Sequence, residues 1–229
     1  MESADRSASI VPASRPSEKF GTDSSGNSTC VLYEAVKAYY DRRAPEYDDW
    51  WLGRGLYADR DRPGWEDELR LLEGVIRGLP AVRTLDVACG TGFLTRHLRG
   101  DVVGLDASER MLEVARGQAP QARFEQGDAL TLPFDDDAFD RVFTSYFYCH
   151  LEDDEREWFL AEARRVASEL VVVASIRGDG DAFERWEDRR LEDGSQWSVY
   201  KRVFEGPDLA AELGGEVVFK GSWFVVVRA

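Results

Sequence analysis

One stretch limits the possible folds more than any other, the run 84–93, which reads TLDVACGTGF. Its first half is mostly apolar, as in a buried strand, and two closely spaced glycines follow it. The residues after them, 92–98, have the apolar spacing of a helix. Glycines between a strand and a helix let the backbone turn sharply and let a ligand lie against it. This order predicts the opening unit of a doubly wound α/β fold.

Strands and helices alternate along most of the chain. We expect strands at 82–88, 102–106, 122–126, 138–145 and 169–176, and helices at 33–43, 63–79, 92–98, 108–118 and 153–167. Two further strands, 216–219 and 223–227, are separated by only three residues, so they must form an antiparallel hairpin. The sequence predicts a Rossmann-like α/β fold, a seven-stranded and mostly parallel sheet with an antiparallel C-terminal hairpin and helices on both faces.

The length of 229 residues fits one sizeable domain, which we place at 30–229. Residues 1–29 are rich in Ser, Pro, Gly and Asp and predict a disordered tail. The segment 177–206 mixes aromatic and charged residues, and its alternation over 196–204 predicts an extended strand. Such an insertion would cover the substrate side of the domain, unless it only pads the sheet.

The net charge of -15 argues against nucleic-acid or anionic-membrane partners, because phosphate would be repelled. No apolar run approaches a membrane span. The three cysteines, Cys30, Cys89 and Cys149, lack metal or redox spacing. We therefore expect a cytoplasmic protein without a metal that acts on a small molecule, and the sequence sets no oligomeric state.

Three carboxylates follow the predicted strands and distinguish between possible cofactors. A dinucleotide site requires a third glycine at the position where this chain has Thr95. In addition, Asp86, four residues before Gly90, would repel the pyrophosphate of a dinucleotide. That carboxylate suits a cofactor with an amino group and a sulfonium, which favours S-adenosylmethionine over NAD. Asp106 can accept from ribose hydroxyls, and Asp128 from the adenine amino group. Each carboxylate has a structural alternative. Asp86 could cap a helix or brace the loop, Asp106 could be a solvent-facing residue at the strand end, and Asp128 could be an ordinary turn residue.

Over about 39–145 the chain resembles class I S-adenosylmethionine-dependent methyltransferases, in the small-molecule branch that includes quinone- and natural-product-methylating enzymes. The resemblance implies methyl transfer to an oxygen, carbon or nitrogen of a metabolite. The alternatives are a Rossmann oxidoreductase and a methyltransferase-like protein that binds the cofactor without transferring its methyl group. The resemblance implies cofactor contacts from Asp86, Ala88, Gly90, Gly92, Asp106, Ala107, Met111, Asp128, Ala129 and Ser145.

The run 39–48 is similar to the N-terminal helix that closes over the cofactor in this branch, so 30–62 is expected to be a lid. Tyr39 and Tyr47 would then face the methionine carboxylate or the methyl group, although aromatic residues on a helix can equally be core. The chain departs from many relatives at 166–169, where it lacks a Pro-Gly-Gly turn before the next strand.

The strand at 138–145 would deliver Tyr146 and His150 to the substrate as candidate catalytic residues. A neutral imidazole can act as a general base, and positioning and purely structural roles are the alternatives. The run 145–148, Ser-Tyr-Phe-Tyr, differs from the Asn/Asp-Pro-Pro-Tyr/Phe of amine and adenine methyltransferases, which disfavours that subtype. Acidic runs at 135–137 and 152–155 hint at a preference against anionic acceptors, unless they are only solvated faces.

Overall fold

The computed structural model describes residues 11–12, 30–176, 178 and 182–229. The predicted tail therefore falls outside the described residues, apart from the two-residue strand β1 (Val11–Pro12). Within the described part no helix is long and apolar enough to span a membrane.

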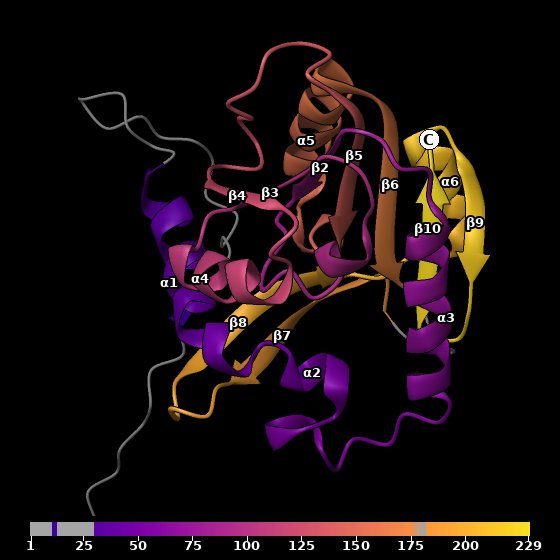
Figure 1. Cartoon of the computed structure of the whole chain (residues 1–229). Helices are drawn as coiled ribbons and strands as arrows, with labels where there is room; N and C mark the ends of the chain where they lie inside the picture. Colours follow the sequence, from indigo (N-terminus) through magenta and orange to yellow (C-terminus); the bar gives the residue numbers. More distant parts are fainter. Residues whose placement is uncertain (1–10, 13–29, 177, 179–181) are drawn as a thin grey trace, which may run out of the picture.

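The main sheet has seven strands in the order β4-β3-β2-β5-β6-β10-β9 (Figure 1). The first five are parallel, β10 pairs antiparallel with β6, and β9 pairs antiparallel with β10. The predicted sheet and its C-terminal hairpin are confirmed. Its strands are β2 (Thr84–Val87), β3 (Val102–Asp106), β4 (Arg123–Gln126), β5 (Phe139–Ser145), β6 (Ala167–Ser175), β9 (Glu216–Lys220) and β10 (Phe224–Arg228).

Helices cover both faces of this sheet, as predicted. Strand order runs outward in both directions from β2 and β5, and right-handed crossovers then place the connections of the two halves on opposite faces. One face carries α3 and α4, and the other carries α5 and α6, which are joined by an ion pair from Arg156 to Glu212. The bounds of these helices are α3 (Trp65–Gly78), α4 (Glu109–Gln118), α5 (Asp153–Val166) and α6 (Gly206–Leu213).

The helix predicted over 92–98 is wrong. The structure has one turn of 3-10 helix there, η3 (Thr95–His97), and Leu98 is already extended, with ψ of 146°. Leu94 and Leu98 are both buried, so their spacing of four imitates a helix face. The chain must reach β3 at Val102, and three residues leave no room for a longer helix.

The N-terminal segment contains α1 (Cys30–Arg43), a 3-10 turn at Ala44–Glu46 and the short helix α2 (Asp49–Leu52). Pro45 lies in the 3-10 turn, so the α-helix ends at Arg43, where the helix predicted over 33–43 also ends. The end of α5 at Val166 abuts the start of β6, so the missing Pro-Gly-Gly turn leaves no loop.

The insertion forms a second, three-stranded sheet of order β1-β8-β7. Strand β8 (Gln196–Arg202) matches the extended segment expected there, whereas β7 (Glu184–Arg190) was not predicted because charged residues fill it. The two strands form a hairpin that lies below the carboxyl ends of β5 and β6 and beside α1 and α2 (Figure 1). The insertion therefore lies near the carboxyl ends of the parallel strands, the edge at which open α/β sheets bind ligands, and its role in covering a substrate stays a prediction.

Candidate active site

The glycine turn after β2 adopts a backbone that most residues avoid. Ala88, Gly90 and Gly92 all have left-handed φ angles, of 55°, 55° and 74°. A Cβ on Gly92 would lie 3.2 Å from the backbone of Ala115 in α4, so that glycine is also required for close packing. The turn therefore presents backbone atoms at the carboxyl edge of the sheet, as the sequence predicted.

Asp86 is buried in β2 and has one free acceptor. Thr95 donates a hydrogen bond of 2.6 Å to its Oδ2, while Oδ1 has no partner among the described residues. Burial raises the pKa of this carboxyl to about 7, and the nearby Asp106 adds to the rise. A buried acceptor without a donor is costly, so the site fits a ligand that donates a hydrogen bond or carries positive charge.

Asp106 at the end of β3 joins the glycine turn to α4. Its Oδ2 accepts from the Gly90 N–H at 2.8 Å, and its Oδ1 accepts from the Ser108 N–H at 2.9 Å. Burial raises its pKa to about 6, although the backbone hydrogen bonds oppose this rise. The carboxylate thus acts as a loop brace, and each oxygen keeps a second lone pair for a ligand hydroxyl.

The other predicted cofactor residues lie along the same edge. Asp128 follows β4 and accepts from the Leu130 N–H at 2.9 Å, which is the contact of a turn residue. The remaining positions comprise the carbonyl of Ala107, which accepts from Gln126, the buried Met111 of α4, the partly buried Ala129, and Ser145 at the end of β5. Parallel strands bring these ends together, so the structure gathers the predicted set.

Two aspartates attach the N-terminal segment to the cofactor loops. Ser108 donates to Asp41 at 2.6 Å, and Thr91 in the glycine turn donates to Asp48 at 2.5 Å. Gln118 of α4 also donates to Asp48. Sequence reasoning missed these contacts, because it considered only the tyrosines of the segment.

The two predicted tyrosines of this segment lie in different surroundings. A Cβ on Gly90 would lie 3.5 Å from the Tyr47 ring, so Tyr47 lies directly over the glycine turn. Tyr39 is fully buried against Trp197 of the insertion, and Arg43 and Arg189 donate to its hydroxyl. Burial acts to raise the pKa of Tyr39, but those two guanidinium groups together outweigh it and lower the pKa. Tyr39 therefore joins α1 to the insertion, and Tyr47 is the tyrosine that lies against the turn.

Tyr146 and His150 follow β5, as predicted. Tyr146 has a left-handed φ of 58° and packs edge-on against Trp50 of α2, with ring centroids 4.8 Å apart. Burial raises the pKa of Tyr146, so its hydroxyl stays neutral. The Nδ1 of His150 lies 2.6 Å from the carbonyl oxygen of Tyr200, which makes Nδ1 the protonated nitrogen. Burial, with repulsion from Arg189, lowers the pKa of His150 to about 3.

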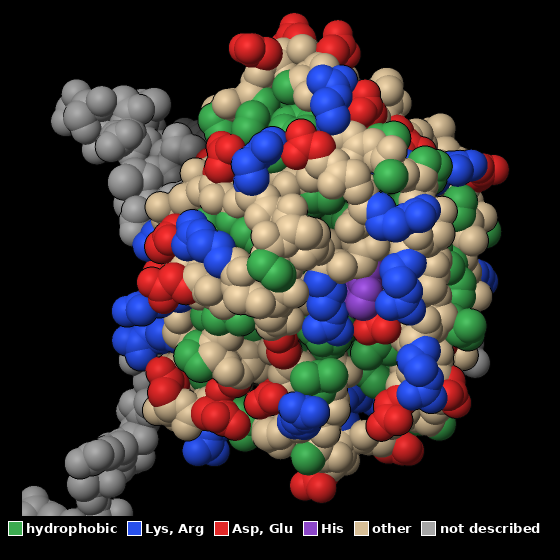
Figure 2. Space-filling view, viewed as in Figure 1, with side chains coloured by type: hydrophobic (Ala, Val, Ile, Leu, Met, Phe, Trp, Pro, Cys, Tyr) green, Lys and Arg blue, Asp and Glu red, His purple; other side chains and the backbone are tan. Residues whose placement is uncertain are grey.

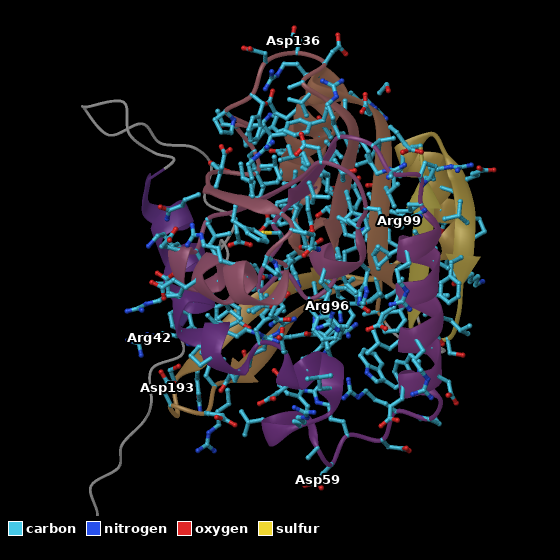
Figure 3. The ribbon with its side chains drawn as sticks, in the orientation of Figure 1. Arg42, Asp59, Arg96, Arg99, Asp136 and Asp193 are labelled. Carbon is cyan, nitrogen blue, oxygen red and sulfur yellow. The ribbon has the colours of Figure 1, made fainter. Side chains whose placement is uncertain are left out.

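One face of the molecule mixes charges of both signs. Figure 2 shows acidic and basic side chains interspersed over the face it presents. The acidic run 135–137 does not flank the site. Figure 3 shows Asp136 at the end of the molecule opposite the insertion, and it pairs with Arg165 at 3.1 Å. The expected preference against anionic acceptors therefore rests on the acidic run 152–155 alone.

A parallel sheet with acids at the ends of β2 and β3 and a glycine turn between them defines the Rossmann-like class of nucleotide-cofactor domains. A family model described as a methyltransferase domain matches residues 84–169. The chain is 34% identical over 146 residues to a demethylmenaquinone methyltransferase of Renibacterium salmoninarum, covering 61% of this chain and 58% of that protein.

A 2-phytyl-1,4-naphthoquinone methyltransferase of Synechocystis is 32% identical over 171 residues, covering 67% of this chain and 68% of that protein. A solved structure of DhpI with S-adenosylhomocysteine is 25% identical, with a TM-score of 0.65, and the match covers 86% of this chain and 95% of DhpI. The chain therefore belongs to the S-adenosylmethionine-dependent methyltransferases. It spans only a little over half of the Renibacterium enzyme.

Proposed function

We propose that this protein transfers the methyl group of S-adenosylmethionine to an oxygen, carbon or nitrogen of a small molecule. The observation that carries the proposal is the Oδ1 of the buried Asp86, which has no partner among the described residues and lies beside a turn with left-handed backbone at Ala88, Gly90 and Gly92. A cationic, hydrogen-bond-donating group satisfies that oxygen, and a pyrophosphate does not. Family membership supports the same cofactor.

Each part of the cofactor has residues that suit it. Asp86, with the backbone of Ala88, Gly90 and Gly92, would hold the methionine part, and Asp106 would accept from the ribose hydroxyls. Asp128 and Ala129 would border the adenine. When bound, S-adenosylmethionine supplies a methyl group already activated by its sulfonium.

The chain's own residues then orient the acceptor and exclude water. Methyl transfer is an in-line displacement, so alignment of the acceptor atom contributes most to the rate. With a pKa of about 3, His150 is a weak base at neutral pH, and we assign it positioning through its bond to the Tyr200 carbonyl. Neutral Tyr146 can donate a hydrogen bond to the acceptor.

Saturating S-adenosylhomocysteine is expected to raise the melting temperature of the protein. A ligand at about 100 times its dissociation constant stabilises the native state by about 2.7 kcal/mol, because it binds only the folded form. Differential scanning fluorimetry checks this, with NAD⁺ as the control ligand. A shift with NAD⁺ and none with S-adenosylhomocysteine would overturn the proposal. Cofactor binding without turnover on a broad acceptor panel would indicate a non-catalytic binding protein.

Cofactor affinity is expected to rise with pH between about 6 and 8. Asp86 has a folded-state pKa of about 7, so the free protein at pH 6 holds a proton that must leave before the carboxylate meets the ligand's amino group. Below that pKa the affinity falls by up to about 10-fold per pH unit.

Titration calorimetry of S-adenosylhomocysteine across this range, in buffers of different ionisation enthalpy, measures both the slope and the released proton. Asp86→Asn should bind more weakly at pH 8 and lose most of the pH dependence. An equal slope in Asp86→Asn and the unmodified protein would assign the titration to another group.

A further inference from the structure

The inner face of the insertion hairpin carries more positive than negative charge. Arg185 and Lys201 are directly paired across β7 and β8, and Arg189 lies further along β7 on the same face. All three surround the carboxylate of Glu187, at 2.8 Å for Arg185, 3.0 Å for Arg189 and 4.0 Å for Lys201. Within the described residues Glu187 therefore forms ion pairs with all three of these cations.

These cations are poorly hydrated yet still reachable. The exposed fractions of their side chains are 35% for Arg185, 18% for Arg189 and 15% for Lys201. Burial and repulsion from the two arginines lower the pKa of Lys201. The Nη1 of Arg185 is buried without a partner among the described residues. Uncompensated buried charge is destabilising, and a bound anion would remove that cost.

Three side chains, Tyr39, Arg43 and Tyr47, link the cluster to the cofactor turn. Arg189 donates to the Tyr39 hydroxyl, which Arg43 of α1 also contacts. The Arg43 guanidinium lies 5.1 Å from the centroid of the Tyr47 ring, which covers Gly90. His150 borders the same hairpin through the Tyr200 carbonyl. The hairpin that carries the cluster therefore contacts both α1 and the residues that follow β5.

A purely structural role for the cluster explains less. Ion pairs that only hold a hairpin in place need equal numbers of positive and negative groups. The pair of Arg42 with Asp193 at the tip of this hairpin, visible at the left of Figure 3, has one of each. Three cations around one carboxylate are not balanced, although the chain as a whole has a net charge of -15. Acidic side chains are therefore abundant, yet the described part gathers only one of them here.

We propose, building on the methyl transfer proposed above, that Arg185, Arg189 and Lys201 bind an anionic oxygen group of the acceptor, a carboxylate or a phosphate-type group. Guanidinium forks pair with such groups through two parallel hydrogen bonds, and an ammonium adds a point charge. The acceptor of this protein is therefore an organic anion, and the cluster orients it against the methyl group.

The test measures binding of inorganic phosphate and of acetate to the full chain saturated with S-adenosylhomocysteine, at constant ionic strength set with sodium chloride. Titration calorimetry should show saturable binding of at least one of these anions, and the stronger one identifies the anionic group. Lys201→Met should weaken that binding about 10-fold, because it removes a charge-assisted contact. The matched control is Lys220→Met, at an exposed lysine of β9. It should bind the anion with the same affinity as the unmodified protein.

The melting temperature without anion separates a binding role from a structural one. Lys201→Met relieves repulsion, so it should melt at or above the temperature of the unmodified protein. Arg185→Gln is the second variant, and it should also lose anion affinity. No saturable anion binding, or unchanged affinity in both variants, would overturn the inference. The S-adenosylhomocysteine titration of the same samples tests the proposed function separately, since its failure would count against methyl transfer and not against the anion site.

Discussion

Replacing Asp106 with alanine is expected to weaken binding of S-adenosylhomocysteine by about 2–3 kcal/mol, or about 30- to 150-fold. Two ribose hydroxyls would lose a charged acceptor. The Gly90 and Ser108 N–H groups would also lose the carboxylate that holds the glycine turn against α4. Calorimetry at pH 8, where this carboxyl is ionised, measures the loss directly.

Asp101→Ala is the matched control, because Asp101 is an exposed carboxylate that precedes the opposite end of the same strand. Its removal should leave cofactor affinity unchanged. The cofactor affinity of Asp106→Asn, which keeps one acceptor oxygen, should lie between the affinities of Asp106→Ala and Asp101→Ala. Unaltered affinity in Asp106→Ala would show that this residue is a loop brace and not the ribose ligand.

Removing residues 1–48 is expected to lower cofactor affinity by about 10-fold or more, because the deletion takes away two hydrogen bonds to the cofactor loops and the ring over Gly90. The lost contacts are Asp41 with Ser108, Asp48 with Thr91, and Tyr47 with the turn. A deletion of 1–28 keeps all of them and should bind normally. The seven strands of the main sheet all lie after residue 48, so a folded core should persist in the longer deletion.

Hydrogen exchange decides whether this segment moves as a lid. If 39–48 closes over the cofactor, its amides should exchange faster in the free protein than with S-adenosylhomocysteine bound. The amides of β5, the central strand of the sheet, provide the internal reference. Equal protection across 39–48 with and without ligand would make the segment a fixed part of the core, and acceptor access would then depend on the insertion.

The sequence predicted the main sheet because its signals are local. Continuous apolar runs such as Leu170–Ala174 mark buried parallel strands, and a three-residue link forces the hairpin of β9 and β10. The Ser108 cap of α4 is equally local, since its hydroxyl accepts from the Met111 N–H. The helix over 92–98 failed because buried residues four apart also fit a 3-10 turn that ends in an extended residue.

The candidate cofactor edge follows from the sequence as well, because parallel strands bring Asp86, Asp106 and Asp128 to one side whatever their side chains contact. The tertiary structure was needed to show that Thr95, nine residues away, donates to one oxygen of Asp86 and that the other oxygen has no donor in the described part of the chain. The same is true of His150. Its ordinary pKa makes it a candidate base, but burial beneath the insertion lowers that pKa and makes it a weak base.

The chain alone therefore determined the sheet, its direction of pairing and the carboxylates at its edge, since these depend on periodicity and short links. Only the tertiary structure decided what faces that edge. Arg43, Arg189 and Lys201 come from segments up to 158 residues apart and appear in the sequence as ordinary surface charges. Their desolvation and mutual repulsion exist only after α1 and the insertion hairpin pack together, because charge interactions depend on distance in space and on burial.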